Sequence, residues 1–239
     1  MMRIKFVMTS RDKEFRIPET AFSDFNTKQD QILTVPQYNL DNKTPLTKLY
    51  NDLFAEERDR GSDGYDYLVL LHADALVSVE NLCTKIAMYA DKYDIMGLAG
   101  TKVVDTTHSP LSWFTASTQY PDKRYGSVWH DQLGDMGRNL FNSHDPRATD
   151  ARVSIIDGLC IIVSKKVIDS GIRFDERFTF DFYDIDFCFT AVMLYKFRIG
   201  VLVELVIHGS VGMAIRDKSY LKPEALFREK WKLKPIQVS

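Results

Sequence analysis

The chain has 239 residues, of which 45% are hydrophobic and 27% are charged, and its formal net charge is -2. This length and composition are typical of one globular domain that folds without the support of disulfides or a structural metal. The near balance of charge excludes the class of strongly basic nucleic-acid-binding proteins, so we expect no nucleic-acid partner.

The N-terminal segments predict two strands and a helix. Apolar residues alternate with others over Arg3–Thr9, which predicts a strand, and a second short apolar run follows at Ile32–Val35. Thr44 before Pro45 is a typical helix start, with Thr as N-cap and Pro in the first helical position. Apolar residues at helical spacing then predict an amphipathic helix over Thr44–Arg58.

The next segments complete an alternation of strands and helices. Tyr67–Leu71 is apolar on both faces, as expected of a central parallel strand. An amphipathic helix is predicted over Ser78–Asp91 and a buried strand at Ile95–Ala99. This order predicts an α/β fold, with an open and mostly parallel central sheet that carries helices on both faces.

Residues 101–152 lose this periodicity and are rich in aromatic and polar side chains. A long aperiodic insert in a compact domain is usually functional or disordered, and its aromatic content argues against disorder. We therefore expect the segment to contain much of a recognition site, with Trp113 and Trp129 as candidates to stack on a ligand. The competing interpretation is a hydrophobic cluster that only covers the sheet.

Regular structure is predicted again after residue 152. The expected strands and helices are Val153–Ile156, Leu159–Val163, a short helix that ends at Gly171, a helix from about Asp184 to Tyr195, the strand Val201–Ile207, and one helix or two turns over Ser219–Trp231.

The cysteines and the apolar runs bear on location. Cys83, Cys160 and Cys188 are odd in number and lie among apolar residues, which predicts reduced thiols in a reducing compartment. The run Ile4–Met8 is too short for a signal peptide, and no stretch approaches the roughly 18 apolar residues of a spanning helix. We expect a cytoplasmic protein with no transmembrane segment.

His72 and Asp74 form the first candidate for chemistry. In an extended chain residues i and i+2 point to the same side, and these two follow a central strand at its carboxyl end, where open α/β sheets bind ligands. An imidazole and a carboxylate placed in this way can share a divalent cation. A strand end followed by a turn explains the same spacing equally well. His208 follows another buried strand and by itself is more often structural.

The second candidate is the acidic and aromatic stretch around Asp181, Asp184 and Asp186. Hydrophobic neighbours raise the pKa of a carboxyl group and suit it to general-base catalysis. The alternative is an acidic helix N-terminus, in which Asp181 or Asp184 caps the helix. Asp157-Gly158 predicts a turn.

Taken in order, these motifs resemble the family 2 glycosyltransferases with the GT-A fold, in the branch whose metal motif begins with His or Gln. The matching segments are Tyr50-Asn51, Tyr67–Asp74, Asp157-Gly158-Leu159 with Ser164-Lys165-Lys166, Gly171–Phe178, Tyr183–Cys188, His208 and Lys230-Trp231. Two positions depart from the family pattern. His72 replaces the first acid of the Asp-x-Asp motif, and Tyr183 replaces the Glu of the Glu-Asp motif.

The resemblance implies a single GT-A, Rossmann-like domain over 1–239, with a nucleotide-sugar-binding half at 1–100 and an acceptor-binding and catalytic half at 101–239. It implies a UDP-, GDP- or dTDP-sugar donor and a hydroxyl of a glycan or glycoconjugate as acceptor, as in polysaccharide biosynthesis. The donor-binding residues that it implies are Thr9, Ser10, Arg11, Tyr50, Asn51, Asp74, Asp157 and Gly158.

The same resemblance implies a divalent cation, Mn²⁺ or Mg²⁺, held by Asp74 with help from His72 and His208. It assigns the general base of an inverting transfer to Asp184, with Asp181 and Asp186 as the alternatives.

Two rival functions use the same residues. His72, Asp74 and His208 also fit the 2-His-1-carboxylate iron site of Fe(II)/2-oxoglutarate oxygenases, in which Arg216 would hold the cosubstrate. Those enzymes resemble jelly rolls, whereas helices are predicted on both sides of the strand that carries His72. The third function is a non-catalytic nucleotide-sugar-binding domain that has lost its base.

Overall fold

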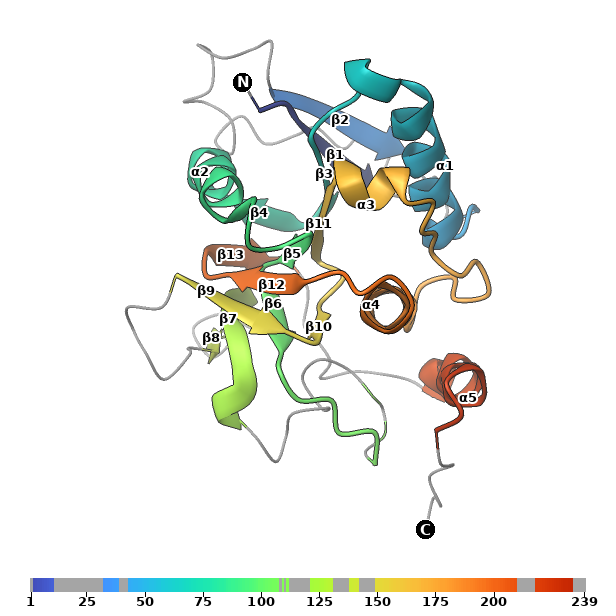
Figure 1. The fold of residues 1–239 in the computed structure, drawn as a ribbon. Helices are drawn as coiled ribbons and strands as arrows, with labels where there is room; N and C mark the ends of the chain where they lie inside the picture. Colours follow the sequence, from blue (N-terminus) through green and yellow to red (C-terminus); the bar gives the residue numbers. More distant parts are fainter. Residues whose placement is uncertain are drawn as a thin grey trace.

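The computed structural model describes residues 2–10, 32–38, 43–107, 109, 111, 121–130, 138–141, 149–209 and 218–233, and these form a mixed α/β fold with two sheets. Figure 1 shows the helices arranged around the larger of the two sheets. The strands of the first sheet are β1 (Ile4–Ser10), β2 (Ile32–Tyr38), β3 (Tyr67–His72), β5 (Ile95–Gly97), β9 (Asp150–Val153), β11 (Cys160–Ser164) and β12 (Ile199–Leu202). Their order is β2-β1-β3-β11-β5-β12-β9.

The first sheet is mostly parallel, as predicted. Strand β1 pairs in parallel with both β2 and β3, and β5 pairs in parallel with β12. Strand β11 lies antiparallel between β3 and β5, and β9 is antiparallel to β12 at one edge. Leu68, Val69 and Leu70 of β3 are completely buried, as expected of a strand covered on both faces.

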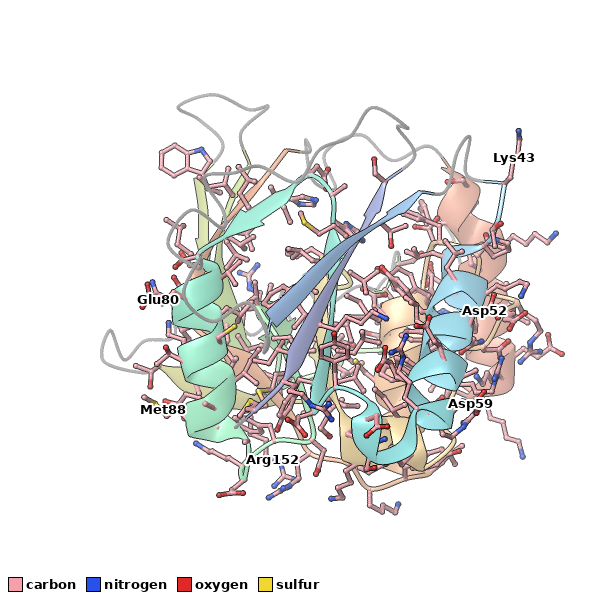
Figure 2. All side chains as sticks on the ribbon, turned by 90° about the horizontal axis from the view of Figure 1, so that it is seen from above. Lys43, Asp52, Asp59, Glu80, Met88 and Arg152 are labelled. Carbon is pink, nitrogen blue, oxygen red and sulfur yellow. The ribbon has the colours of Figure 1, made fainter. Side chains whose placement is uncertain are left out.

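Helices cover both faces of this sheet. The helices are α1 (Leu46–Asp59), α2 (Val79–Tyr89), α3 (Lys165–Asp169), α4 (Tyr183–Met193) and α5 (Leu221–Lys230). Helix α2 lies on one face, and α1, α3 and α4 lie on the other (Figure 1). The view from above in Figure 2 shows α1 and α2 on opposite sides of the central strands, with most side chains packed between them.

The second, smaller sheet was not predicted. Its strands are β4 (Ala75–Val77), β6 (Ala99–Thr101), β7 (Arg124–His130), β10 (Ile155–Ile156) and β13 (Leu205–His208), in the order β10-β6-β7-β13-β4, with β8 (Arg138–Phe141) paired to β7. Three segments expected as single strands each divide between the two sheets. The chain leaves the first sheet and enters the second at Leu98, at Ser154 and at Val203-Glu204.

The expectation of an aperiodic insert at residues 101–152 is corrected by the same sheet. This segment supplies β7 and β8, and β7 pairs in parallel with β13 so that His130 is in register with His208. Within the described part of the segment, Tyr125, Val128 and Trp129 therefore belong to a sheet. The pattern escapes notice because Gly126 (φ 126°) lies in the middle of β7 and interrupts the alternation.

The structure also describes the three cysteines and the lengths of the helices. All three cysteines are free thiols, with Cys160 and Cys188 buried and Cys83 partly exposed. Within the described residues, no helix has the length and apolar character needed to cross a bilayer.

Candidate active site

His72, Asp74 and His208 lie together at the end of the central strands. His72 is the last residue of β3, and a two-residue turn carries the chain through Asp74 into β4. Strand β4 pairs with β13, which places His208 opposite Ala75. One ligand atom from each of the three side chains lies within 4.8 Å of the others. His208 Nε2 is 3.4 Å from Asp74 Oδ1.

The charges in this cluster suit a divalent cation. Burial lowers the pKa of His72, so its imidazole is neutral near pH 7 and can act as a ligand. Burial opposes ionisation of Asp74, but the hydrogen bond and charge of His208 outweigh it and lower the pKa of Asp74. Burial would lower the pKa of His208, yet the Asp74 carboxylate raises it. The Asp74 carboxylate therefore favours the protonated form of His208.

The Asp157-Gly158 turn connects this cluster to α4. Asp157 Oδ1 accepts a hydrogen bond from the backbone N–H of Leu159 at 2.8 Å, and the carbonyl of Leu159 accepts one from the N–H of His72 at 3.0 Å. The negative charge of Asp157 also acts on the pKa values of His72, His208 and Asp184. These four groups therefore belong to one electrostatic site.

Asp184 lies in the first turn of α4 and faces this turn. One carboxylate oxygen accepts a hydrogen bond from the N–H of Gly158 at 2.9 Å, and the other accepts one from the N–H of Ile185 at 2.8 Å. Burial and then the charge of Asp157 raise the pKa of Asp184 to about 7. A carboxyl group with that pKa can take up a proton at neutral pH.

The start of α4 differs from the alternative in which Asp181 or Asp184 caps the helix. The N-cap is Phe182, a buried residue in the left-handed region with φ 69°, and it makes no side-chain capping bond. Phe182 packs on Phe227 of α5 at a ring-centroid distance of 5.5 Å. Packing thus holds an uncommon backbone conformation one residue before Tyr183, at the point where the chain turns toward the site.

The other two aspartates of this stretch lie elsewhere. Asp186 is 1% exposed and accepts hydrogen bonds from Lys230 Nζ at 2.7 Å and Trp231 Nε1 at 2.8 Å, which attach the end of α5 to α4. Asp181 is partly buried and precedes the helix. Asp184 is therefore the member of the trio that contacts the Asp157-Gly158 turn.

The sequence did not predict that two aromatic residues, Tyr183 and Phe180, contact His72. The Tyr183 hydroxyl donates a hydrogen bond to the carbonyl of Gly158 at 3.0 Å and lies 3.2 Å from His72 Nε2. Phe180 is 61% exposed, and its ring stacks at 6.5 Å from that of His72. The aromatic spacing around the aspartates was the available signal, but spacing alone does not tell a packed ring from an exposed one.

The residues expected to bind a donor meet the site at the end of β1. Thr9 is in register with His72 on the neighbouring strand. The hydroxyls of Thr9 and of Tyr50 on α1 are both buried and near each other, but neither makes a hydrogen bond of good geometry within the described residues. Ser10 is buried at the end of β1, and Arg11 lies outside the described residues.

Asn51 makes contacts of a different kind. Its buried amide donates to the carbonyl of Phe174 and to Glu176, and it accepts the N–H of Phe174 at 2.8 Å. These bonds attach α1 to the segment that leads into α4. Contact of Asn51 with a donor stays a prediction, and its bonds give it a positioning role.

The structure describes one of the two tryptophans proposed for acceptor recognition. Trp129 on β7 is in register with Ile207 of β13, so it lies on the opposite face of the second sheet from His208. Trp113 lies outside the described residues. Among the described aromatic residues, Phe180 is the exposed one whose ring contacts the cluster.

Comparisons with known proteins give matches in structure. No protein-family model matches the chain, and no curated protein matches it in sequence. Among solved structures, it is similar to A197 from STIV, with 17% identity, a TM-score of 0.43, and coverage of 84% of this chain and 82% of the other. It is also similar to TarS 1–349 from S. aureus, with 13% identity and a TM-score of 0.42. That alignment covers 87% of this chain and 60% of the TarS chain.

Proposed function

We propose that this protein is a metal-dependent inverting glycosyltransferase, which moves a sugar from a nucleotide-sugar donor to a hydroxyl of a glycan or glycoconjugate. One observation carries the proposal. A carboxyl group with a pKa near 7, Asp184, is held by the Asp157-Gly158 turn, and the same turn borders the cluster of His72, Asp74 and His208. A candidate base and a candidate cation site thus share one edge of an open α/β sheet.

The cluster fits a divalent cation. It offers one carboxylate and two imidazoles, and His208 Nε2 faces the Asp74 carboxylate at 3.4 Å, where a bound cation would take the place of a proton on the ring. Imidazole ligands favour Mn²⁺ over Mg²⁺. When bound, the cation would neutralise the negative charge that grows on the departing diphosphate. Asp74, His72 and His208 would hold it.

Asp184 would act on the acceptor. Its carboxylate takes the proton of the acceptor hydroxyl as that oxygen forms a bond to the anomeric carbon. The bond between the anomeric carbon and the diphosphate oxygen breaks, and the nucleoside diphosphate leaves. Attack from the face opposite the leaving group inverts the anomeric configuration. The two backbone N–H groups that hold Asp184 fix its direction without neutralising it.

The buried hydroxyls at the end of β1 support a donor site there. Buried polar groups are normally hydrogen-bonded, and those of Thr9 and Tyr50 face only each other, in poor geometry, among the described residues, so we propose that a bound donor offers them a better partner. The exposed ring of Phe180, which stacks near His72, offers an apolar surface to a sugar ring.

The rival functions meet these observations less well. An oxygenase would use the same three ligands, but β3 belongs to an open, mostly parallel sheet between helices rather than to a jelly roll. Arg216, its expected cosubstrate contact, lies outside the described residues. A non-catalytic binder would have no need of a carboxyl group with a raised pKa beside the cation site.

The test is turnover of a panel of UDP-, GDP- and dTDP-sugars with Mn²⁺, followed by proton NMR. We expect one donor to be consumed, at first by slow hydrolysis, and the released sugar to have the anomeric configuration opposite to that of the donor. Release with the configuration retained would contradict the role of Asp184. Tight binding without any turnover would favour the non-catalytic binder, and decarboxylation of 2-oxoglutarate with Fe(II) would favour the oxygenase.

A further inference from the structure

The two positions at which this sequence departs from the glycosyltransferase pattern contact each other. His72 stands where the metal motif has its first acid, and Tyr183 stands where the catalytic motif has Glu. They are 111 residues apart in the chain, yet His72 Nε2 lies 3.2 Å from the Tyr183 hydroxyl oxygen. The contact joins the end of β3 to the start of α4.

Counting protons assigns the direction of this hydrogen bond. The Tyr183 hydroxyl has a single hydrogen, and it donates that hydrogen to the carbonyl of Gly158, which can only accept. Toward His72, the hydroxyl oxygen must therefore accept. His72 Nε2 is then the protonated nitrogen, and in a neutral ring Nδ1 keeps the free lone pair.

We infer that Tyr183 is a positioning residue that fixes His72 in the Nε2–H tautomer and so reserves Nδ1 as its ligand nitrogen. The inference rests on the cation site of the proposed function and adds a specific role for Tyr183. Metal-binding histidines usually donate their other N–H to a neighbouring acceptor, which fixes the tautomer and the ring orientation. In this chain a tyrosine hydroxyl would be that acceptor.

The surroundings of Tyr183 hold its hydroxyl in place. The side chain is 4% exposed, and its ring packs against those of Tyr50 and Phe174, with centroid distances of 6.1 Å to each. Gly158 leaves the necessary space, because a Cβ atom there would be 2.0 Å from the Tyr183 hydroxyl oxygen. The acceptor of His72 is thus fixed by packing on one side and by a hydrogen bond on the other.

The first test reads the tautomer directly, in metal-free protein near pH 8. Long-range proton–nitrogen NMR distinguishes the two neutral forms of a histidine ring. We expect His72 to be the Nε2–H tautomer in the wild-type protein and a mixture of tautomers in Tyr183→Phe. A wild-type His72 with its proton on Nδ1, or a tautomer unchanged in Tyr183→Phe, would overturn the inference.

The second test measures affinity for Mn²⁺ alone, by electron paramagnetic resonance of the free ion. Tyr183→Phe keeps the packed ring and removes the hydroxyl, and we expect it to weaken binding by about 10-fold or more. The matched control is Tyr93→Phe, which removes a buried hydroxyl that is bonded to Asp150, away from the site. The control should bind Mn²⁺ like the wild-type protein. Equal affinity in Tyr183→Phe and the control would overturn the inference.

A double-mutant cycle then separates positioning from general damage. If Tyr183 acts through His72, Tyr183→Phe should have no further effect on Mn²⁺ affinity in a His72→Ala background. Full additivity would contradict it. None of the three experiments uses a nucleotide sugar. Their results therefore stand even if the protein transfers no sugar. Conversely, if the wild-type protein transfers sugar and Tyr183→Phe binds Mn²⁺ with unchanged affinity, the proposed function stands and this inference is wrong.

Discussion

Replacement of Asp184 by Asn tests the origin of its raised pKa and its role as a base. Burial and the charge of Asp157 raise that pKa from 3.8 to about 7. Because the folded-state value is the higher one, the folded protein retains a proton that the unfolded chain has lost. The free energy of unfolding of the wild-type protein therefore decreases as pH rises from about 4 through about 7.

The size of the effect follows from these two values. Between pH 5.5 and pH 8 the linkage amounts to about 2 kcal/mol of unfolding free energy, at roughly 1.4 kcal/mol per unit of pKa. The side-chain amide of Asp184→Asn cannot ionise, so the variant should lack this part of the pH dependence. The NH₂ group of the amide also faces the backbone N–H of either Gly158 or Ile185, so that one hydrogen bond is lost. This loss lowers the free energy of unfolding by about 1–3 kcal/mol at every pH.

Urea unfolding of both proteins at pH 5.5 and pH 8, in metal-free buffer, measures this difference. The pH-independent cost cancels when the change between the two pH values is compared. We expect the wild-type protein to lose about 2 kcal/mol more than Asp184→Asn over this interval. Sugar transfer should rise with pH through about 7 in the wild-type protein and fall by roughly 10²–10⁴ in the variant. An identical pH dependence of stability in the two proteins would refute the assignment of the raised pKa.

The remaining predictions concern the cation, α5 and the acceptor. Asp74→Ala should abolish the thermal stabilisation that a nucleoside diphosphate gives with Mn²⁺. His208→Ala should only weaken this stabilisation, because His208 would be a neutral ligand. Unaltered stabilisation in Asp74→Ala would exclude Asp74 as a metal ligand. Asp186→Asn should lower the free energy of unfolding by about 1–3 kcal/mol, since one of Lys230 and Trp231 loses its buried acceptor, with transfer per folded molecule retained; loss of transfer without loss of stability would move the base to Asp186. Phe180→Ala changes an exposed ring, so stability should stay within about 0.5 kcal/mol while KM for the acceptor rises; an unchanged KM would remove Phe180 from the acceptor site.

The main sheet and its helices could be predicted because their signals are local. The continuous apolar run of β3 and the helical spacing after Pro45 both reflect burial on known faces, and both are confirmed. The second sheet could not be predicted in this way. At Leu98 and Ser154 the chain changes sheets while its residues on either side remain buried and apolar, so the hydrophobic pattern continues across the break.

In the candidate site, too, local features could be predicted from the sequence and long-range contacts could not. Its candidate cation ligands follow strands, and the rule that ligands bind at the carboxyl ends of such strands was sufficient to select His72 and Asp74 as candidates. The sequence showed only that Tyr183 replaces the Glu of the family motif. Its contact with His72, 111 residues away in the chain, could be found only in the structure. The resemblance already placed Asp184 ahead of Asp186, but the bonds of Asp186 to Lys230 and Trp231 depend on the position of α5, which the spacing of residues in α4 does not predict.

The central claim, a nucleotide-sugar site that depends on a cation, is tested most directly by calorimetric titration of UDP, GDP and dTDP into the protein, with Mn²⁺ and again with excess chelator. We predict that at least one of the three binds with Mn²⁺, that chelation abolishes the binding, and that Asp74→Ala lacks it. At about 100 times its dissociation constant this ligand should stabilise the fold by about 2.7 kcal/mol. Failure of all three to bind with Mn²⁺, or equal binding with chelator and in Asp74→Ala, would contradict the account.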